Sequence, residues 1–304
     1  MADYVFMGVL VSCFVFQMSK IYHYLPLDNY EVGMATTAGE EENEIKFYAA
    51  NVLQKNKKSE LLITEIAEVD PDIILLTETN ERWKNDISTA ISGYPYKVEE
   101  PLDNTYGILL YSKFKLIEPE VKYLVDKEIP SIHSKIELNS GKIIQLYAIH
   151  PTPPMPQHNP SSTARDAEMM IVAKLAKNSP LPVIVAGDFN DVPWSETSEM
   201  FKEVGSVLDT RIGRGFYNSF DAKSFIMRWP LDHFFVTEEF RVKDLKLGDE
   251  IASDHFPLLI ILSLEPEVAS KQKPKPVEAQ ELKKANKQIE QAQEEQVEKL
   301  EGRK

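Results

Sequence analysis

Apolar runs that end, or begin, at a carboxylate, an amide or an imidazole recur along the middle of this chain. Each run has the length of a buried β-strand. The runs are Phe47–Asn51, Ile73–Glu78, Ile143–His150, Pro182–Asp188, Leu231–Val236 and Pro257–Ile261. Loops at strand ends are where a rigid sheet presents functional side chains, so the six runs together predict one site built from distant parts of the chain.

Helical patterns alternate with these strands. Ser59–Val69 and Ser162–Lys177 carry apolar residues at helical spacing, and Ser195–Val204 is a third helix with Ser195 as its N-cap. Two further strands, Tyr106–Tyr111 and Ser131–Leu138, alternate in the manner of antiparallel hairpins. The mixture predicts an α/β fold with two packed sheets and helices outside them.

The two ends of the chain depart from this pattern. Residues 1–24 hold an apolar run followed by Lys20, Tyr22 and Tyr24, which predicts a membrane-anchoring helix. A helix packed on the core and a lipidated or cleaved leader stay open as alternatives. Residues 25–44 are acidic and predict a solvated linker. Residues 265–304 predict a charged linker and a marginal helix with no catalytic part.

Composition excludes some kinds of site. Cys13 is the only cysteine, which excludes an intrachain disulfide and a cysteine-ligated zinc site. The six histidines lack the spacing of a zinc cluster, so carboxylate and amide ligands favour magnesium or manganese. The net charge is −14, and more than half of it falls on residues 45–264. This acidity argues against the broad basic surface that holds nucleic acid tightly.

The most specific chemistry lies in Gly187-Asp188-Phe189-Asn190-Asp191 and Ser253-Asp254-His255. Carboxylates, amides and imidazoles are ligands for hard divalent cations and proton-transfer groups for hydrolysis. A single Asp or Asn at a strand end is more often a turn former or helix cap, so the inference depends on the whole set. His233 adjoins Asp232 on a strand and should point to the opposite face, which predicts a structural role.

The order Asn51, Glu78, His150, Asp188 with Asn190, Asp232, and Asp254 with His255 resembles the endonuclease/exonuclease/phosphatase superfamily. That group includes deoxyribonuclease I, apurinic endonucleases, neutral sphingomyelinases and inositol-polyphosphate 5-phosphatases. The stretches 148–154, 211–215 and 228–233 resemble a bacterial membrane-linked branch of it. The resemblance covers residues 45–264 as a catalytic domain and implies a four-layer α/β/β/α sandwich of two mixed sheets with flanking helices.

The same resemblance implies a divalent-metal-dependent phosphoester hydrolase. Water would be activated by Asp188, and phosphate would be held by Asn190, His255 and His150. Asp232 would fix the tautomer of His255. The implied ligands of Mg²⁺ or Mn²⁺ are Glu78, Asn51 and Asp254, and the candidate phosphate clamps are Arg211, Arg214 and Arg228. Tyr106 and Tyr147 both stay candidates for the tyrosine of the superfamily.

The sequence leaves the substrate open among nucleic acid, a phospholipid head group and a small diester. A competing hypothesis is a catalytically silent, membrane-tethered binding or scaffold domain, against which the intact set of residues argues. We expect membrane association through the single N-terminal helix, although Lys20 alone does not fix the side on which the catalytic domain lies. The sequence gives no indication of an obligate oligomer.

Overall fold

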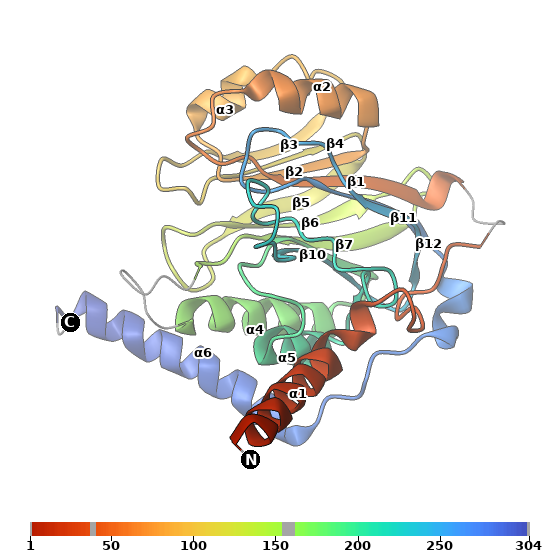
Figure 1. Ribbon diagram of the computed structural model, residues 1–304. Coiled ribbons are helices and arrows are strands. Elements are labelled where there is room, and N and C mark those ends of the chain that lie inside the picture. The colour runs from red at the N-terminus through yellow and green to blue at the C-terminus, as the bar shows by residue number, and fades with distance from the viewer. Residues whose placement is uncertain (1, 37–40, 154–161, 303–304) are drawn as a thin grey trace.

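Two mixed six-stranded sheets stack face to face, with helices on both outer faces (Figure 1). The structure, a computed structural model, describes residues 2–36, 41–153 and 162–302. The first sheet has the order β11 (Phe240–Leu247), β12 (Leu258–Leu264), β1 (Glu44–Asn51), β2 (Ile73–Thr77), β4 (Ile108–Ser112) and β3 (Tyr96–Glu100). The second has the order β5 (Lys115–Lys122), β6 (Ser131–Glu137), β7 (Ile143–Ile149), β8 (Val183–Asp188), β10 (Asp232–Val236) and β9 (Leu208–Asp209).

Each sheet contains one parallel pair, β1 with β2 and β7 with β8, and its other pairs are antiparallel. The strands of a parallel pair end at the same edge, which therefore collects the polar residues that follow the apolar runs. The prediction of antiparallel strands at residues 106–111 and 131–138 is confirmed. Strand β4 pairs antiparallel with β2 and β3, and β6 pairs antiparallel with β5 and β7.

Helices α2 (Ser59–Val69) and α3 (Glu81–Asp86) cover the first sheet, whereas α4 (Thr163–Asn178) and α5 (Glu196–Gly205) cover the second (Figure 1). Between the sheets lies a core of aliphatic and aromatic side chains such as Phe47, Ile184 and Phe234. The four-layer α/β/β/α prediction is confirmed. The N-cap prediction is confirmed as well, since the Ser195 hydroxyl accepts a hydrogen bond from the backbone N–H of Ser198 at 2.9 Å.

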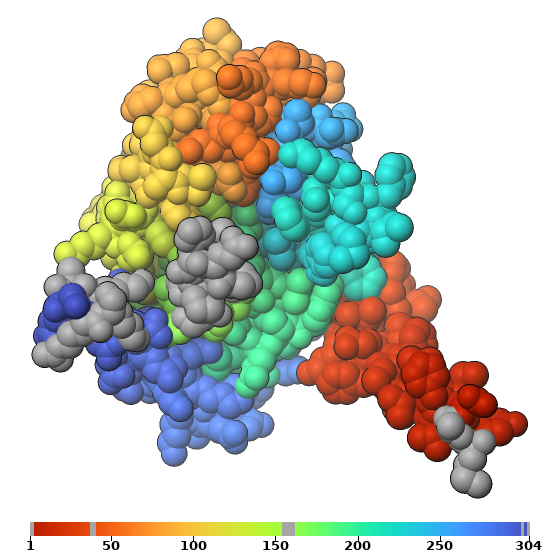
Figure 2. Space-filling view, turned by 60° about the vertical axis from the view of Figure 1, so that its left-hand side comes forward, coloured from red at the N-terminus to blue at the C-terminus, as the bar shows by residue number. Residues whose placement is uncertain are grey.

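The N-terminal helix α1 (Ala2–Ile21) projects away from the sandwich (Figure 2). Its stretch Asp3–Tyr24 is long and apolar enough to cross a membrane, and the most apolar part of that stretch is not buried at all within the protein. Phe6 is 66% exposed and Phe14 is 65% exposed. In this structure α1 does not pack on the core, because it presents its apolar side chains outward.

Residues 25–36 are not the solvated linker expected from their acidity. After the short helix η1 (Tyr22–Tyr24), Val32 is fully buried and Glu31 accepts a hydrogen bond from the Asp209 backbone at 2.6 Å. The Ala35 N–H donates to Val242 O on β11 at 2.9 Å. Glu40 lies outside the described residues, and η2 (Glu41–Asn43) leads directly into β1. This segment fixes the C-terminal end of α1 on the domain because apolar burial and backbone pairing both hold it.

The C-terminal segment also packs against the domain, which corrects the expectation of a marginal helix. Beyond η3 (Pro266–Lys271), helix α6 (Ala279–Leu300) lies along α4 and buries Ala285 and Ala292 (Figure 1). The small alanine side chains allow two helices to approach closely, and Lys284 pairs with Glu196 of α5 at 2.8 Å. The sequence pattern failed here because so narrow an apolar stripe does not by itself predict a docking face.

Candidate active site

The polar ends of six strands meet at one edge of the sandwich. In the register of the parallel pairs, Asn51 lies beside Thr77 and Ile149 lies beside Gly187, so Glu78 and His150 follow at the same edge. Asp232 lies opposite Asp188 in the antiparallel pair of β10 with β8. The six runs recognised in the sequence thus deliver their side chains to one place, as their pattern predicted.

The loop after β8 is shaped by its glycine and its amide. Gly187 has a φ of +141°, and a Cβ there would lie 1.9 Å from the Ile149 carbonyl oxygen, so only glycine fits. Asn190 has a φ of +51°, and its backbone N–H donates to Asp188 Oδ1 at 3.0 Å. This hydrogen bond holds the carboxylate in a fixed rotamer at the strand end.

Arg165, at the start of α4, was missed from the sequence. Its guanidinium donates to the Asn190 carbonyl at 2.9 Å and lies 3.4 Å from a carboxylate oxygen of Asp191. Arg165 is buried, and it holds the loop that carries Asp188. The sequence did offer one signal, an arginine in the first turn of a helix among residues with a core-like apolar pattern. That signal does not identify the residue with which the arginine pairs.

Asn51 bridges two carboxylates. Its Nδ2 donates to Glu78 Oε1 and to Asp188 Oδ2, both at 3.0 Å, while its Oδ1 accepts the Leu53 N–H at 3.0 Å. The amide oxygen is therefore engaged by the backbone and the amino group faces the site. The amide oxygen still has a second lone pair, so metal ligation by Asn51 stays a prediction.

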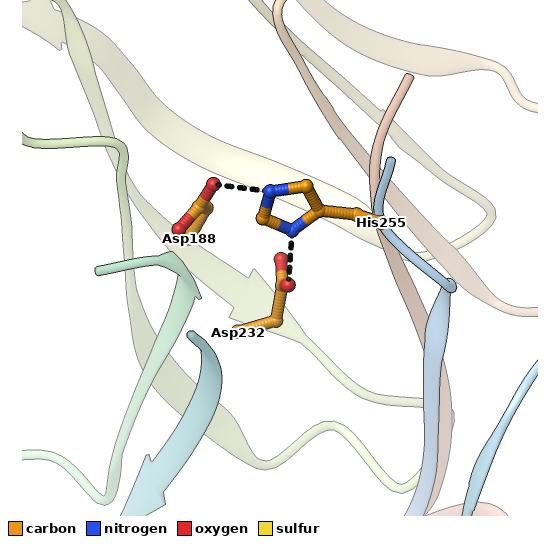
Figure 3. Close-up of side chains that lie close together, drawn as sticks. All are labelled: Asp188, Asp232 and His255. Carbon is orange, nitrogen blue, oxygen red and sulfur yellow. Dashed lines mark hydrogen bonds and ion pairs between the residues drawn. The ribbon is translucent and has the colours of Figure 1, made fainter. Parts of the chain in front are cut away.

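His255 lies between two buried carboxylates (Figure 3). Its Nδ1 is 2.8 Å from Asp232 Oδ2, and its Nε2 is 3.6 Å from Asp188 Oδ2. Burial by itself lowers the pKa of the imidazole, but the negative charges of Asp232 and Asp188 outweigh it and raise the pKa to about 10. A protonated imidazole donates from both nitrogens, so His255 has the charge state suited to holding an anionic phosphate oxygen.

Among the described residues, one group of side chains lies close enough together to hold a metal ion. One ligand atom from each of Asp188, Asp232 and His255 lies within 4.8 Å of the others. In that set, however, the imidazole is engaged by Asp232 and carries a proton. Glu78 and Asp254 are half-buried carboxylates, and Glu78 Oε2 accepts the Gln54 N–H at 3.3 Å. The donors at this edge are mainly carboxylates, which are the ligands of hard cations.

His150 lies on the other side of Asp188. Its Nε2 is 3.8 Å from Asp188 Oδ2, and its buried Nδ1 has no hydrogen-bond partner within the described part of the chain. The ring of Tyr106 lies 5.5 Å from the imidazole, between centroids. Tyr147 packs instead against His133, and its hydroxyl donates to the Leu175 carbonyl at 3.4 Å. Of the two tyrosines considered, Tyr106 is the one beside the site.

Asp254 and Asn190 lie at the rim of this edge. Ser253 donates from its hydroxyl to the Asn51 carbonyl at 2.7 Å and accepts the His255 N–H at 3.1 Å, which brings the Ser253-Asp254-His255 turn against β1. The Asn190 amide donates to the Pro151 carbonyl at 3.0 Å, which ties the loop after β8 to the loop that carries His150. Within the described ranges, Pro151 is the acceptor recorded for this amide, which has a second N–H to donate.

The expectation that three arginines clamp phosphate needs correction at two of them. Arg211 is fully buried and pairs with Asp209 at 2.9 Å, so its guanidinium has no face open to a substrate. Arg214 donates to the Val32 carbonyl at 2.6 Å and lies over the Tyr30 ring, so it fastens the N-terminal segment. Only Arg228 lies near the site, 4.9 Å from the Phe256 ring, although its Nε donates to the Ser224 carbonyl.

His233 is structural, as its position on the strand predicted. It is buried, with Nε2 2.8 Å from the Asp191 carbonyl and Nδ1 2.7 Å from Arg211 Nη2. Asp209, which the sequence reading did not single out, completes this network. The chain from Asp209 through Arg211 and His233 to Asp191 supports the loop of Asp188 from behind.

Glu168 of α4 gives a prediction about stability. It is 2% exposed, and its Oε1 has no hydrogen-bond partner among the described residues. Burial, together with the charge of Asp126, raises the pKa of this carboxyl from 4.5 to about 8. As the pH rises between those values, the unfolded chain releases a proton that the folded chain retains, so the wild type loses stability over that range.

Glu168→Gln should therefore stabilise the protein at pH 8 and have little effect at pH 4. We expect roughly 2–3 kcal/mol at the higher pH, taking about 1.4 kcal/mol per pKa unit and allowing for relaxation around the buried charge. Thermal unfolding across this pH range measures the difference. Glu68→Gln, at an exposed position on α2, is the control and should change Tm little at any pH. An effect of Glu168→Gln that does not vary with pH would contradict the prediction.

The sequence model described as Endonuclease/Exonuclease/phosphatase family matches residues 42–255 of this chain. No curated protein sequence matches it. Among solved structures, TDP2 of D. rerio complexed with a single-strand DNA product has 17% identity and a TM-score of 0.62, covering 72% of this chain and 99% of that one. The human Nocturnin catalytic domain with bound sulfate has 17% identity and a TM-score of 0.58, covering 75% and 96%.

A mannosyl-6-phosphatase of Bacteroides thetaiotaomicron VPI-5482 has 20% identity and a TM-score of 0.54, covering 72% of this chain and 100% of that one. At these identities the structural likeness establishes the fold alone. Family membership follows from the sequence match, which spans well over half of the chain and includes every strand end that forms the site.

Proposed function

Because the chain belongs to the endonuclease/exonuclease/phosphatase family, we propose that it is a divalent-metal-dependent hydrolase of phosphoester bonds. The observation that carries the proposal is the convergence of Glu78, His150, Asp188, Asp232 and His255 from separate strands at one buried edge. Burying several carboxylates together is costly unless a cation or a proton compensates them, so their retention favours a functional site.

The contacts support a division of roles. Asp188, fixed by Asn51 and by the Asn190 backbone, is the base that orients and deprotonates the attacking water. His255, kept protonated by Asp232, holds one non-bridging phosphate oxygen. His150 contacts the phosphate from the opposite side, and the second amide N–H of Asn190 binds a further oxygen. Tyr106, against His150, is positioned toward the leaving group.

Mg²⁺ or Mn²⁺ would be held by Glu78 and Asp254, beside Asp188. When bound, the cation would polarise the phosphoryl oxygen and offset the charge that develops in the transition state. The structural neighbours agree with phosphate chemistry, since one is complexed with a DNA product, one binds sulfate and one is named a phosphatase. The acidity of residues 45–264 favours a lipid-borne or small phosphoester over tightly held nucleic acid.

The test uses the full chain purified in detergent. It is incubated with bis-p-nitrophenyl phosphate, single-stranded DNA or phospholipid vesicles, with Mg²⁺, with Mn²⁺ and with EDTA. Cleavage that requires the metal supports the proposal, and a steep loss of DNA cleavage with added salt would identify nucleic acid as the substrate. No cleavage of any substrate under any metal condition would contradict the enzyme and leave the scaffold hypothesis.

Glu78→Gln should weaken the binding of the metal and leave the fold intact. Since Glu78 is the ligand we assign, we expect the metal concentration for half-maximal activity to rise more than about tenfold, a loss seen even for outer-shell partners of a metal. Titration of Mn²⁺ by electron paramagnetic resonance measures the binding directly. Glu81→Gln, at an exposed position three residues along the chain, should bind Mn²⁺ as the wild type does. Unchanged Mn²⁺ affinity in Glu78→Gln would remove Glu78 as a ligand.

A further inference from the structure

Three consecutive large apolar side chains project into solvent beside the site. Phe225 is 98% exposed, Ile226 is 89% exposed and Met227 is 57% exposed. Single exposed apolar residues are common on soluble proteins, but a contiguous group at a loop tip marks an interaction surface. We call residues 221–229 the apolar loop.

The apolar loop has an ordered backbone. Its base is closed by the Phe220 N–H, which donates to the Trp229 carbonyl at 2.9 Å. Within the loop, the Ser224 hydroxyl accepts the Met227 N–H at 2.8 Å, and the Ser224 carbonyl accepts from Arg228 Nε at 2.6 Å. Backbone groups satisfied in this way can enter an apolar environment without losing hydrogen bonds to water.

The base of the apolar loop is part of the site edge. The Phe220 ring lies 5.0 Å from the His255 ring, between centroids, and the Ala222 N–H donates to the Asp254 carbonyl at 2.8 Å. The Phe256 N–H donates to the Ser219 carbonyl at 2.9 Å. Whatever the tip binds is therefore held next to His255.

The C-terminal end of α1 is fixed to the same connection, which joins β9 to β10 and contains the apolar loop. Tyr24 packs against Phe216, with ring centroids 6.3 Å apart, and its hydroxyl donates to the Pro193 carbonyl at 3.0 Å. The Gly213 N–H donates to the His23 carbonyl at 2.8 Å. Figure 2 shows α1 (red) and the chain around residue 220 (turquoise) projecting on the same side of the molecule.

We propose that the tip of the apolar loop inserts into the bilayer that holds α1, so that the site faces phosphoesters borne by lipids. The apolar tip meets the acyl boundary, and Lys223 and Arg228 on either side of it meet anionic head groups. Helix α1 supplies the anchor, and the apolar loop fixes the orientation of the site relative to the membrane. The lipid-borne substrate rests on the proposed function, whereas the insertion does not.

Insertion is measured without catalysis. The full chain carrying Cys13→Ser and Ile226→Cys is labelled with the fluorophore NBD and reconstituted in vesicles of phosphatidylcholine with a minority of phosphatidylserine. We expect a blue-shifted emission and several-fold stronger quenching by spin-labelled lipid than at a control label. The control is Thr89→Cys in the same Cys13→Ser background, an exposed position three residues beyond α3. Helix α3 lies on the outer face of the first sheet, at the end of the molecule opposite α1 (Figure 1). Equal emission and quenching at the two positions overturn the proposal.

A second measurement separates the apolar loop from the anchor. The triple variant Phe225→Ser, Ile226→Ser, Met227→Ser keeps α1 and should cleave bis-p-nitrophenyl phosphate as the wild type does, while losing several-fold in turnover of a vesicle-borne phosphoester. Unchanged turnover at the vesicle would overturn the orienting role. If the wild type cleaves neither substrate, the proposed function fails, and the fluorescence result still decides the insertion.

Discussion

Asp188→Asn should lower kcat/KM for a soluble phosphodiester by about 10²–10⁴, the usual cost of removing one acid–base or electrostatic group. The carboxylate accepts hydrogen bonds from the Asn51 side chain and the Asn190 backbone, and its Oδ2 lies within 4 Å of both His255 and His150. An asparagine has the same shape but cannot take a proton from water. The loss should therefore fall on turnover, measured as kcat at saturating substrate and metal.

The fold of Asp188→Asn must be checked independently. The amino group of the new asparagine would face either the Asn51 amide N–H or the Asn190 backbone N–H, both of which are donors. We therefore expect a loss of about 1–3 kcal/mol in the free energy of unfolding. Circular dichroism and thermal unfolding measure that loss. Asp244→Asn, at an exposed position on β11, is the matched control and should change neither kcat nor Tm appreciably. Wild-type kcat in Asp188→Asn would remove the water-activating role and leave only a structural one.

The strand ends were predictable because two signals coincide there. An apolar run of strand length identifies the buried element, and a polar residue at its end is costly unless the site uses it. Asp188, Asp232 and His255 satisfy both conditions, and the structure brings them within hydrogen-bonding or near-contact distance.

Side-chain partners across loops were not predictable. Arg211 reads as an exposed phosphate clamp, yet Asp209 lies two residues before it and the two pair in the interior. The amide of Asn51 has an oxygen and an amino group that the sequence cannot orient, and the contacts give the amino group to the site. Residues 25–36 look solvated by charge, but Val32 and the pairing with Val242 hold them. Each case depends on where a side chain points in three dimensions, which local composition does not encode.

The largest loss of stability should come from breaking the buried pair of Arg211 with Asp209. Both side chains are fully buried, and Arg211 Nε and Nη2 donate to the two carboxylate oxygens at 3.0 and 2.9 Å. Burial alone raises the pKa of Asp209, but Arg211 outweighs it and the pKa is lowered, so the carboxylate stays charged. Removing either partner leaves an uncompensated charge in the interior. We therefore expect Asp209→Asn or Arg211→Met to lower the free energy of unfolding by about 3–5 kcal/mol.

The double variant Asp209→Asn, Arg211→Met should lose clearly less than the sum of the single variants, because no charge is left unpaired in the interior. Denaturant unfolding of the four proteins measures the coupling. Lys115→Met, which breaks an exposed pair with Glu137, is the control and should leave the free energy of unfolding nearly unchanged, because solvent screens exposed pairs. Arg211 contacts His233, which in turn contacts the Asp191 carbonyl. The single variants should therefore also have a lower kcat, even at temperatures far below Tm where they remain folded. Additive losses in the double variant would show that the two charges do not compensate each other. Wild-type kcat in the single variants would show that the pair does not support the loop that carries Asp188.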